Sequence, residues 1–363
     1  MTDMIPPLRA ATIGSGKISE EHLKFLRAGD PAQLVGVCDL SPALAAWSAR
    51  QFGAAAAYTD HRVMLEEAKP QVVHVLTPPH THEAIITDCL AAGAHVITEK
   101  PVAPTHAQFT ALWQAAQRAG VLLIEDHNYR FNAPVRELGA IIDRGELGEI
   151  VEVEVRMSLN VRGEGNRYAD RNLPHPSHRL PCGVIHEFIT HLCYLSLHLL
   201  PTSEDIRVDK AAWRNVGRRG EDDPFMYDDL DAMVSVGAGR ARIRFTSQTQ
   251  PDGFYVTARG TKGFAEADLF VPYLRPVVYP TGFGPLASMV SLRRVAKRLK
   301  RDARRAFWSK VLQEGSYDGL RHFLAGTYHA IATGAPPPVT FDDMDRTSRL
   351  IDALAAQAEG ARA

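Results

Sequence analysis

The chain has 363 residues, which is enough for two domains that each bury a core. Its hydrophobic content of 45% and charged content of 23% are ordinary for a globular protein, and a net charge of −1 argues against nucleic acid as a partner. Four cysteines without a Cys-x-x-Cys spacing favour free thiols in a reducing compartment: Cys38, Cys89, Cys182 and Cys193. We expect no signal peptide and no membrane-spanning helix, hence a cytoplasmic protein.

A glycine-rich turn opens the chain's first structural unit. Residues 8–13 read as a strand, the segment Gly14-Ser15-Gly16-Lys17-Ile18-Ser19 follows, and a helical pattern comes next. The first glycine permits the tight turn, and the second lets the backbone approach a pyrophosphate at the helix N-terminus. Ser19 replaces the usual third glycine and is small enough to keep the helix close to the strand. Alone, the motif is equally compatible with an ordinary strand-to-helix turn.

The second strand supports a dinucleotide site because it ends in an acid. Residues 33–38 are apolar, and Asp39 lies 23 residues after Gly16, close to the spacing expected for a carboxylate on the adenosine ribose. No arginine follows in the turn, and a carboxylate would repel a 2′-phosphate. The sequence therefore favours NAD over NADP. Asp39 is also compatible with a helix cap before Pro42.

Strands and helices keep alternating up to about residue 127. Residues 72–76 form a strand that ends at a rigid loop containing Thr77 and Pro78, and residues 94–98 form another that ends at Glu99-Lys100-Pro101. This alternation predicts an α/β fold class, with a doubly wound parallel Rossmann sheet over residues 1–127. Lys100 then lies at the edge of the sheet where such folds bind ligands.

From residue 128 onward the pattern is different. Residues 151–157 alternate apolar and charged side chains, and further strand-like runs cover 232–236, 241–246, 254–259 and 264–267, joined by short glycine turns. Residues 128–363 are therefore expected to form an α+β domain with an open, largely antiparallel sheet; that this domain binds the substrate and forms the oligomer is implied only by the family resemblance described next.

Taken together, these motifs resemble the glucose–fructose oxidoreductase, inositol dehydrogenase and rhizopine catabolism family (Gfo/Idh/MocA). The matching pieces are the glycine turn with His22, Asp39, Thr77-Pro78-Pro79 with His82, Glu99-Lys100-Pro101, Asn128-Tyr129-Arg130-Phe131, residues 145–150, residues 260–263 and residues 334–339. The resemblance implies cofactor contacts at Gly14, Gly16, Lys17, Ile18, Asp39, Thr77, Pro78, His82, Glu99, Lys100 and Asn128. It also implies a homodimer or homotetramer.

By the same resemblance, Lys100 touches both nicotinamide and the substrate hydroxyl. A lysine there is suited to orient the hydroxyl and to stabilise negative charge on its oxygen. The family's second catalytic element matches Glu187 and His191, which share a helix face at i and i+4. His191 is expected to accept the hydroxyl proton. Glu187 replaces the family's aspartate, which leaves its own role open, and a structural buried histidine is the alternative for His191.

The expected substrate contacts are Lys100, Arg130, His178, Glu187 and His191. A zinc site is not expected, because His186 and His191 are five residues apart, whereas two zinc ligands on one helix need a spacing of four. The metal prediction is therefore none.

Residues 291–310 carry the most unusual charge pattern. Eight Lys or Arg residues lie between Arg293 and Arg305, against the single acid Asp302, and Phe307 and Trp308 follow. The pattern predicts a basic amphipathic helix. Three interpretations stay open: a solvated or interface helix whose arginines pair with acids elsewhere, a peripheral contact with an anionic membrane at the inner face, and a site for a phosphorylated substrate.

The sequence as a whole predicts an NAD-dependent oxidoreductase that transfers hydride between nicotinamide and a carbinol carbon of a sugar, cyclitol or sugar derivative, including nucleotide- or lipid-linked sugars. Two alternatives remain. One is a redox-neutral sugar-modifying enzyme that retains and recycles NAD. The other is a non-catalytic regulatory module that keeps the dinucleotide site.

Overall fold

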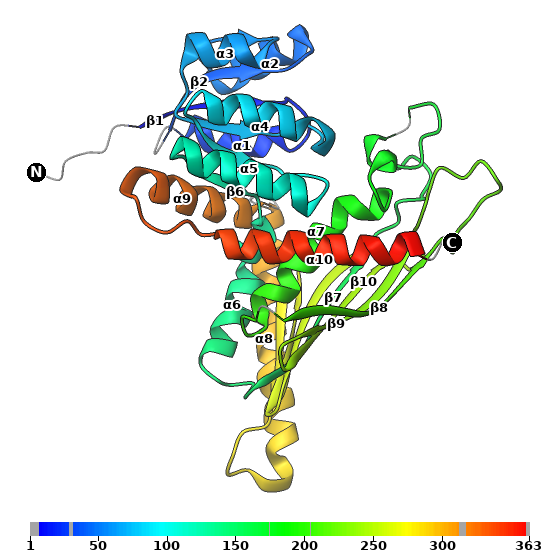
Figure 1. The fold of residues 1–363 in the computed structure, drawn as a ribbon. Coiled ribbons are helices and arrows are strands. Elements are labelled where there is room, and N and C mark those ends of the chain that lie inside the picture. Colours follow the sequence, from blue (N-terminus) through cyan, green and yellow to red (C-terminus); the bar gives the residue numbers. More distant parts are fainter. Residues whose placement is uncertain (1–6, 29–31, 174, 204, 312–316, 361–363) are drawn as a thin grey trace, which may run out of the picture. The chain divides into compact units, whose positions relative to one another are not determined.

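The computed structural model describes residues 7–28, 32–173, 175–203, 205–311 and 317–360 (Figure 1). The chain divides into two compact units: residues 1–128 with 320–345, and residues 129–319 with 346–363. The division differs from the expected one near the C-terminus, because residues 320–345 return to the first unit. Within the described ranges, none of the helices combines the length and apolarity that a bilayer crossing demands.

The first unit is a parallel sheet with strand order β3-β2-β1-β4-β5-β6, which confirms the doubly wound Rossmann fold. Its elements are β1 (Leu8–Ile13), α1 (Ser19–Arg27), β2 (Ala32–Cys38), α2 (Pro42–Phe52), β3 (Ala57–Tyr58), α3 (His61–Ala68), β4 (Val72–Val75), α4 (His82–Ala91), β5 (His95–Thr98), α5 (His106–Ala119), β6 (Leu123–Glu125) and the returning α9 (Asp318–Thr333). The central strands are buried on both faces, as their continuous apolar runs require.

The helices of this unit begin and end at recognisable residues. Ser41 and Thr105 cap α2 and α5 by accepting hydrogen bonds from backbone N–H groups in the first turn, and Gly53 and Gly120 end the same helices with positive φ. These local signals position the loops at the carboxyl edge of the sheet. The two-residue β3 and the helix α3 were not anticipated, because so short a strand has no periodicity to read.

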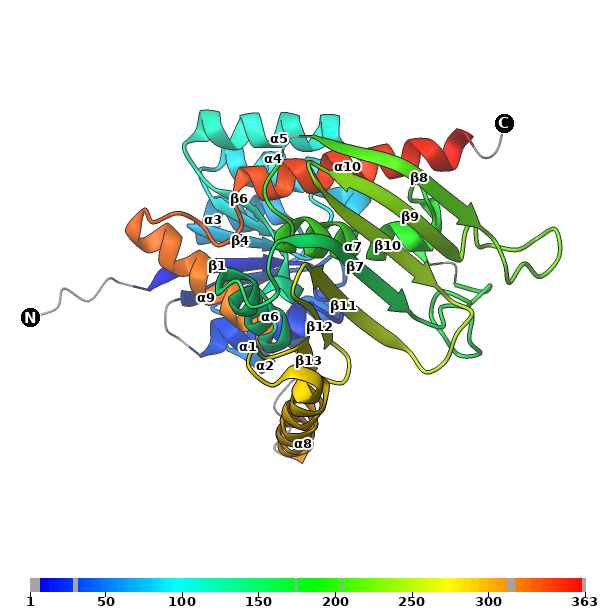
Figure 2. The ribbon, with the colours of Figure 1, turned by 90° about the horizontal axis from the view of Figure 1, so that it is seen from below.

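The second unit is built on a seven-stranded sheet with the order β13-β12-β11-β7-β10-β9-β8 (Figure 2). Its elements are α6 (Ala133–Asp143), β7 (Ile150–Ser158), α7 (Val184–Leu199), β8 (Ile206–Arg214), β9 (Asp229–Val236), β10 (Gly239–Thr246), β11 (Gly253–Gly260), β12 (Gly263–Asp268), β13 (Tyr273–Val278) and α8 (Ala287–Val311); α10 (Phe341–Gly360) ends in it. All neighbouring pairs are antiparallel except β7 and β10. The expected open, largely antiparallel sheet is confirmed.

The two faces of this sheet differ in chemistry. Along β10, Ala241, Ile243 and Phe245 are buried beneath α7, which packs against β7, β10 and β11. Arg242 and Arg244 alternate with them and form ion pairs with acids on β9 and β7. The alternation therefore gives one covered apolar face and one open polar face.

A buried row of polar side chains crosses the first unit. His22 on α1 lies with its Nδ1 2.8 Å from Nδ1 of His74 on β4, and Nε2 of His74 lies 2.9 Å from the hydroxyl oxygen of Tyr328 on α9. All three side chains are fully buried. Burial raises the pKa of Tyr328 and lowers that of His74, so the phenol keeps its proton and the imidazole stays neutral.

The protonation states set the direction of this row. If the Tyr328 hydroxyl donates to Nε2 of His74, then Nδ1–H of His74 donates to Nδ1 of His22. The proton of His22 then lies on Nε2, which points away from His74. The reverse direction would leave the Tyr328 proton without an acceptor among the described residues. Tyr328 therefore anchors the returning helix α9 to the core of the first unit.

We predict that Tyr328→Phe destabilises the protein, because Nε2 of His74 becomes a buried acceptor without a donor. Such a loss costs about 1–3 kcal/mol. Urea unfolding followed by circular dichroism should show the lower midpoint. Tyr279→Phe is the matched control, since that side chain is 62% exposed and should leave the midpoint unchanged. An unchanged midpoint for Tyr328→Phe would contradict the directed row.

Candidate functional site

The glycine turn has the shape that a dinucleotide requires. Gly14 has φ +102°, and a Cβ atom there would lie 2.8 Å from the carbonyl oxygen of Leu76, so only glycine fits. Gly16 faces open space, and Gly16 and Lys17 are exposed at the start of α1. Ser19 is buried and donates from Oγ to the carbonyl oxygen of Gly16 at 2.6 Å. The turn thus offers close backbone approach and free helix N-terminal amides to an anion.

Asp39 follows β2 and is tied to the glycine turn. Its Oδ2 accepts the backbone N–H of Ser15 at 2.7 Å, and its Oδ1 accepts that of Ser41 at 2.8 Å. The carboxylate is therefore fixed beside the turn that would carry the pyrophosphate. The sequence placed Asp39 here by spacing, and the structure brings the two features together.

The loop after β4 also lies at this edge, where Thr77 is half-buried and Pro78 exposed. His82 is also an expected cofactor contact. Its ring is fully buried, with Nδ1 2.8 Å from the carbonyl oxygen of Pro101 and Nε2 2.8 Å from that of Thr77. The His82 ring therefore lies between the loops that contain Thr77 and Pro101, and its predicted contact with the cofactor remains a prediction.

Lys100 follows β5, and its neighbour Glu99 connects it to the buried row. Oε1 of Glu99 lies 3.9 Å from Nε2 of His22, the last atom of the buried row of His22, His74 and Tyr328. Burial alone would raise the pKa of Glu99, but the His22 ring and the Lys100 charge outweigh it and hold that pKa below its ordinary value. Glu99 is therefore an ionised group within the protein, and this indicates a charge-balancing role beside Lys100.

Asp126 was not singled out from the sequence and is the most unusual carboxyl group of the first unit. It is 1% exposed, and neither carboxyl oxygen meets a hydrogen-bond donor among the described residues. Burial raises the pKa of Asp126 well above its ordinary value, and the negative charge of Glu99 adds to the effect. The surroundings therefore favour the protonated form of Asp126 beside a carboxyl group, Glu99, whose ionised form is favoured.

His22, Glu99 and Asp126 each offer an atom, and those atoms lie within 4.8 Å of one another. In the described residues this is the group of acids and histidines that converges most like a metal site. The charge of Lys100 acts on both carboxyl groups. Because that cation already balances Glu99, we interpret the cluster as a proton-holding group, and the absence of a metal site remains a prediction.

Asn128 ends the first segment of the first unit, and Arg130 lies in the second unit, which begins at Tyr129. Asn128 is 9% exposed and follows β6, at the same edge of the sheet as Lys100. The guanidinium of Arg130 lies 6.0 Å from the centre of the Phe131 ring. Their roles toward cofactor and substrate remain predictions.

His191 lies on α7 of the second unit and is 8% exposed. Its Nδ1 lies 2.9 Å from the hydroxyl oxygen of Tyr194, and the ring of Tyr129 meets it edge-on at 4.8 Å between centres. When Nδ1–H donates to Tyr194, Nε2 is left unprotonated and is able to accept a proton. Tyr194, which sequence reasoning missed, therefore orients the His191 ring through Nδ1.

Glu187 is held by the loop that precedes α7. The Tyr168 hydroxyl donates to it at 2.8 Å, Arg167 pairs with it at 3.1 Å, and the Ser177 hydroxyl also donates to it. Nε2 of His178 lies 2.8 Å from the carbonyl oxygen of Tyr168. Tyr168 thus connects Glu187 to His178, and the contacts favour a role for Glu187 in ordering this loop.

These features define the first unit as a Rossmann-type dinucleotide-binding domain. Residues 8–127 match the family described as "Oxidoreductase family, NAD-binding Rossmann fold". This match over the N-terminal domain confirms the resemblance drawn from the motifs.

Curated relatives agree with this assignment over part of their length. The D-glucoside 3-dehydrogenase of Escherichia coli is 34% identical over 151 residues, which cover 41% of this chain and 43% of the relative. The D-apiose dehydrogenase of Paraburkholderia graminis is 29% identical over 147 residues, 40% of this chain and 39% of the relative. The chain thus spans about half the length, or less, of the curated relatives it matches.

Solved structures share the fold of the whole chain. An NAD-binding oxidoreductase from Klebsiella pneumoniae has a TM-score of 0.79 at 21% identity and covers 98% of both chains. The WlbA dehydrogenase from Bordetella pertussis, solved with NADH and UDP-GlcNAcA, has a TM-score of 0.76 at 20% identity and covers 99% of this chain and 97% of that one. At these identities the likeness establishes the fold alone.

We predict that alanine at the two glycines of the turn affects different properties: stability at Gly14 and NADH binding at Gly16. Gly14→Ala should destabilise the protein by roughly 1–3 kcal/mol, because it combines a steric clash with positive φ. Gly16→Ala has open space and should keep its melting temperature, yet its Cβ would point where the backbone must approach a pyrophosphate. Thermal melts with NADH titrations check both. A Gly16→Ala variant that binds NADH normally would contradict the placement of the cofactor.

A second prediction concerns Asp126. The native state retains a proton that the unfolded chain releases above about pH 4, so this contribution to stability is complete below that pH and is lost as the pH rises toward the native pKa. Asp126→Asn, which stays neutral, should therefore gain stability over wild type from about pH 5 to about pH 8. Thermal melts across that range measure the gain.

Glu125→Gln is the control one position earlier. The Glu125 carboxylate accepts the Val102 N–H at 3.2 Å and lies 3.1 Å from Nε2 of His127. The Glu125→Gln variant should therefore lose stability relative to wild type rather than gain it. A stability difference between Asp126→Asn and wild type that stays constant from about pH 5 to about pH 8 would show that Asp126 is ionised in the folded protein across that range.

Proposed function

We propose that the protein is an NAD-dependent oxidoreductase that transfers hydride between nicotinamide and a carbinol carbon of a sugar, cyclitol or sugar derivative. The observation that carries the proposal is the common edge of the first unit's sheet, where the glycine turn, Asp39 and Lys100 follow β1, β2 and β5. The names of relatives that act on a D-glucoside and on D-apiose support a sugar-like substrate.

The residues of the turn fit the cofactor. Gly14, Gly16, Lys17 and Ile18 would hold its pyrophosphate, and Asp39 its adenosine ribose, which favours NAD over NADP. When bound, nicotinamide supplies the hydride acceptor or donor at one face of the substrate carbon. The chain's own residues must then hold the substrate oxygen and move its proton.

Lys100 and His191 have separate tasks in the oxidative direction. Lys100 donates a hydrogen bond to the substrate oxygen and stabilises the negative charge that develops on it. Nε2 of His191 accepts the hydroxyl proton, while its Nδ1–H stays on Tyr194. Glu187, His178 and Arg130 complete the proposed substrate contacts from the second unit.

Further partners are part of the same proposal. We propose a cytoplasmic homo-oligomer without a nucleic-acid partner, and a peripheral contact with an anionic membrane through residues 291–310. A membrane-proximal enzyme would suit a lipid-linked or nucleotide-linked sugar.

We predict that denaturing the purified protein releases NAD(H), and its amount separates two modes of action. A near-stoichiometric quantity that survives gel filtration would support a redox-neutral cycle with a retained cofactor. An empty site that binds NAD(H) from solution would support an ordinary dehydrogenase. NADP(H) as the released or preferred cofactor would contradict the role of Asp39.

Substitution of the two proposed catalytic groups tests the chemistry. Lys100→Met and His191→Asn should each lower kcat with a sugar or cyclitol substrate by roughly 10²–10⁴-fold. Lys262→Met, at an exposed turn of the second unit, is the control and should keep wild-type activity. Normal function in cells carrying Lys100→Met would favour the non-catalytic regulatory module.

A further inference from the structure

Helix α8 carries a cationic charge that the rest of the described chain does not neutralise. Of its eight Lys and Arg residues between Arg293 and Arg305, Arg298 and Arg301 pair with Glu137 on α6 and with Asp302 on α8 itself. In the part of the chain that the structure describes, the other six form no ion pair: Arg293, Arg294, Lys297, Lys300, Arg304 and Arg305. The interpretation that these arginines pair with acids elsewhere therefore holds for two residues only.

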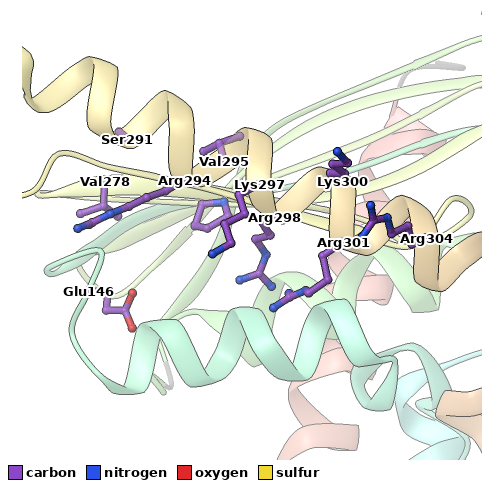
Figure 3. Close-up of a pocket in the computed structure, with 11 residues that line it drawn as sticks. Glu146, Val278, Ser291, Arg294, Val295, Lys297, Arg298, Lys300, Arg301 and Arg304 are labelled. Carbon is purple, nitrogen blue, oxygen red and sulfur yellow. The ribbon is translucent and has the colours of Figure 1, made fainter.

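Several of these cations line one groove. It has a volume of about 760 Å³ and is bordered by α8, by Pro276 and Val278 of β13, and by Glu146 after α6 (Figure 3). Six cationic side chains of α8 line it: Arg294, Lys297, Arg298, Lys300, Arg301 and Arg304. Glu146 is its one acidic lining residue, and Arg144 already pairs with that acid at 2.6 Å. The groove is therefore suited to a multiply charged anion such as a phosphate group.

Helix α8 also exposes several large apolar side chains. Met289, Leu292, Phe307, Trp308 and Val311 are each more than half exposed, at 56, 60, 61, 58 and 52%. In contrast, the polar residues Ser291 and Asp302 are buried against β13, where Asp302 accepts the backbone N–H of Leu274. The helix thus buries polar groups and presents its largest apolar side chains to the outside, which is the reverse of an ordinary surface helix.

We propose that α8 docks on an anionic phospholipid surface, with lipid phosphate groups in the basic groove and the exposed apolar side chains inserted between acyl chains. This inference deepens the proposed membrane contact and does not depend on the hydride chemistry. Charge complementarity argues for the lipid. A second copy of α8 would bring two sets of six unpaired cations together, whereas a phosphate surface neutralises them and an acyl layer covers the apolar side chains.

The full-length protein should sediment with vesicles of phosphatidylcholine and phosphatidylglycerol but not with phosphatidylcholine alone, and salt should weaken the binding. The emission of Trp308 should shift to the blue on binding, and Trp308→Phe should remove that shift. Inorganic phosphate in solution should not displace the protein from the vesicles when the other salt is reduced to keep the ionic strength constant. Displacement by phosphate would assign the groove to a free anion and overturn the lipid as its occupant.

Two sets of variants separate charge from insertion. Arg294→Gln with Lys297→Gln and Arg304→Gln should weaken vesicle binding at least tenfold, and so should Leu292→Ser with Phe307→Ser. The matched control, Arg218→Gln with Arg240→Gln and Lys262→Gln, removes the same charge from other exposed sites of the second unit and should bind as wild type. Unchanged melting temperatures and NADH affinities would show that the folds and the dinucleotide site are intact.

The outcomes distinguish this inference from the proposed catalysis. Equal binding to both vesicle types, binding to neither, or an equal loss in the control set would overturn the docking surface while leaving the hydride chemistry untouched. Light scattering addresses the competing occupant: if the Leu292→Ser and Phe307→Ser variant converts a dimer into a monomer without changing vesicle binding, the apolar side chains contact a second copy instead.

Discussion

The hydrogen bonds from Tyr328 through His74 to His22, and the contact of His22 with Glu99 at 3.9 Å, constrain the first unit. They connect the last helix of that unit, α9, to the strand β4, the helix α1 that follows the glycine turn, and the residue that precedes Lys100. Because the buried Tyr328 hydroxyl must donate its proton to Nε2 of His74, Nδ1 of His74 carries the other proton and donates to His22. The turn and the lysine, although far apart in sequence, are thereby fixed to the same core.

The parts of the fold that depend on local pattern could be predicted from the sequence. The glycine turn, the acid at the end of β2 and the lysine at the end of β5 each follow a short apolar strand, so spacing alone placed them at one edge. Tyr328 could not be found in this way, because 254 residues separate it from His74. Asp126 follows a buried strand, as Lys100 does, so its position in the sequence could have identified it as a candidate site residue.

In the second unit, the sequence pattern predicted the helices but not the contacts that their side chains make. Helical spacing predicted that residues 291–310 form a basic amphipathic helix, and α8 confirms the helix. The pattern did not indicate which face is buried, since that depends on β13, whose Leu274 backbone N–H donates to Asp302, and on α6, whose Glu137 pairs with Arg298. Likewise, the spacing of Glu187 and His191 gave a shared helix face, but only the fold reveals that Tyr168 and Tyr194 bind them.

The charges around Lys100 favour a single arrangement. If Glu99 and Asp126 were both ionised, two buried carboxylates would face one ammonium group, and their mutual repulsion in a poorly solvated site would be severe. The His22 ring N–H favours the ionised state of Glu99, so the proton resides on Asp126. Lys100 then has one counter-ion and a neutral neighbour. The row that begins at Tyr328 therefore favours Glu99 as the carboxylate that balances the charge of Lys100.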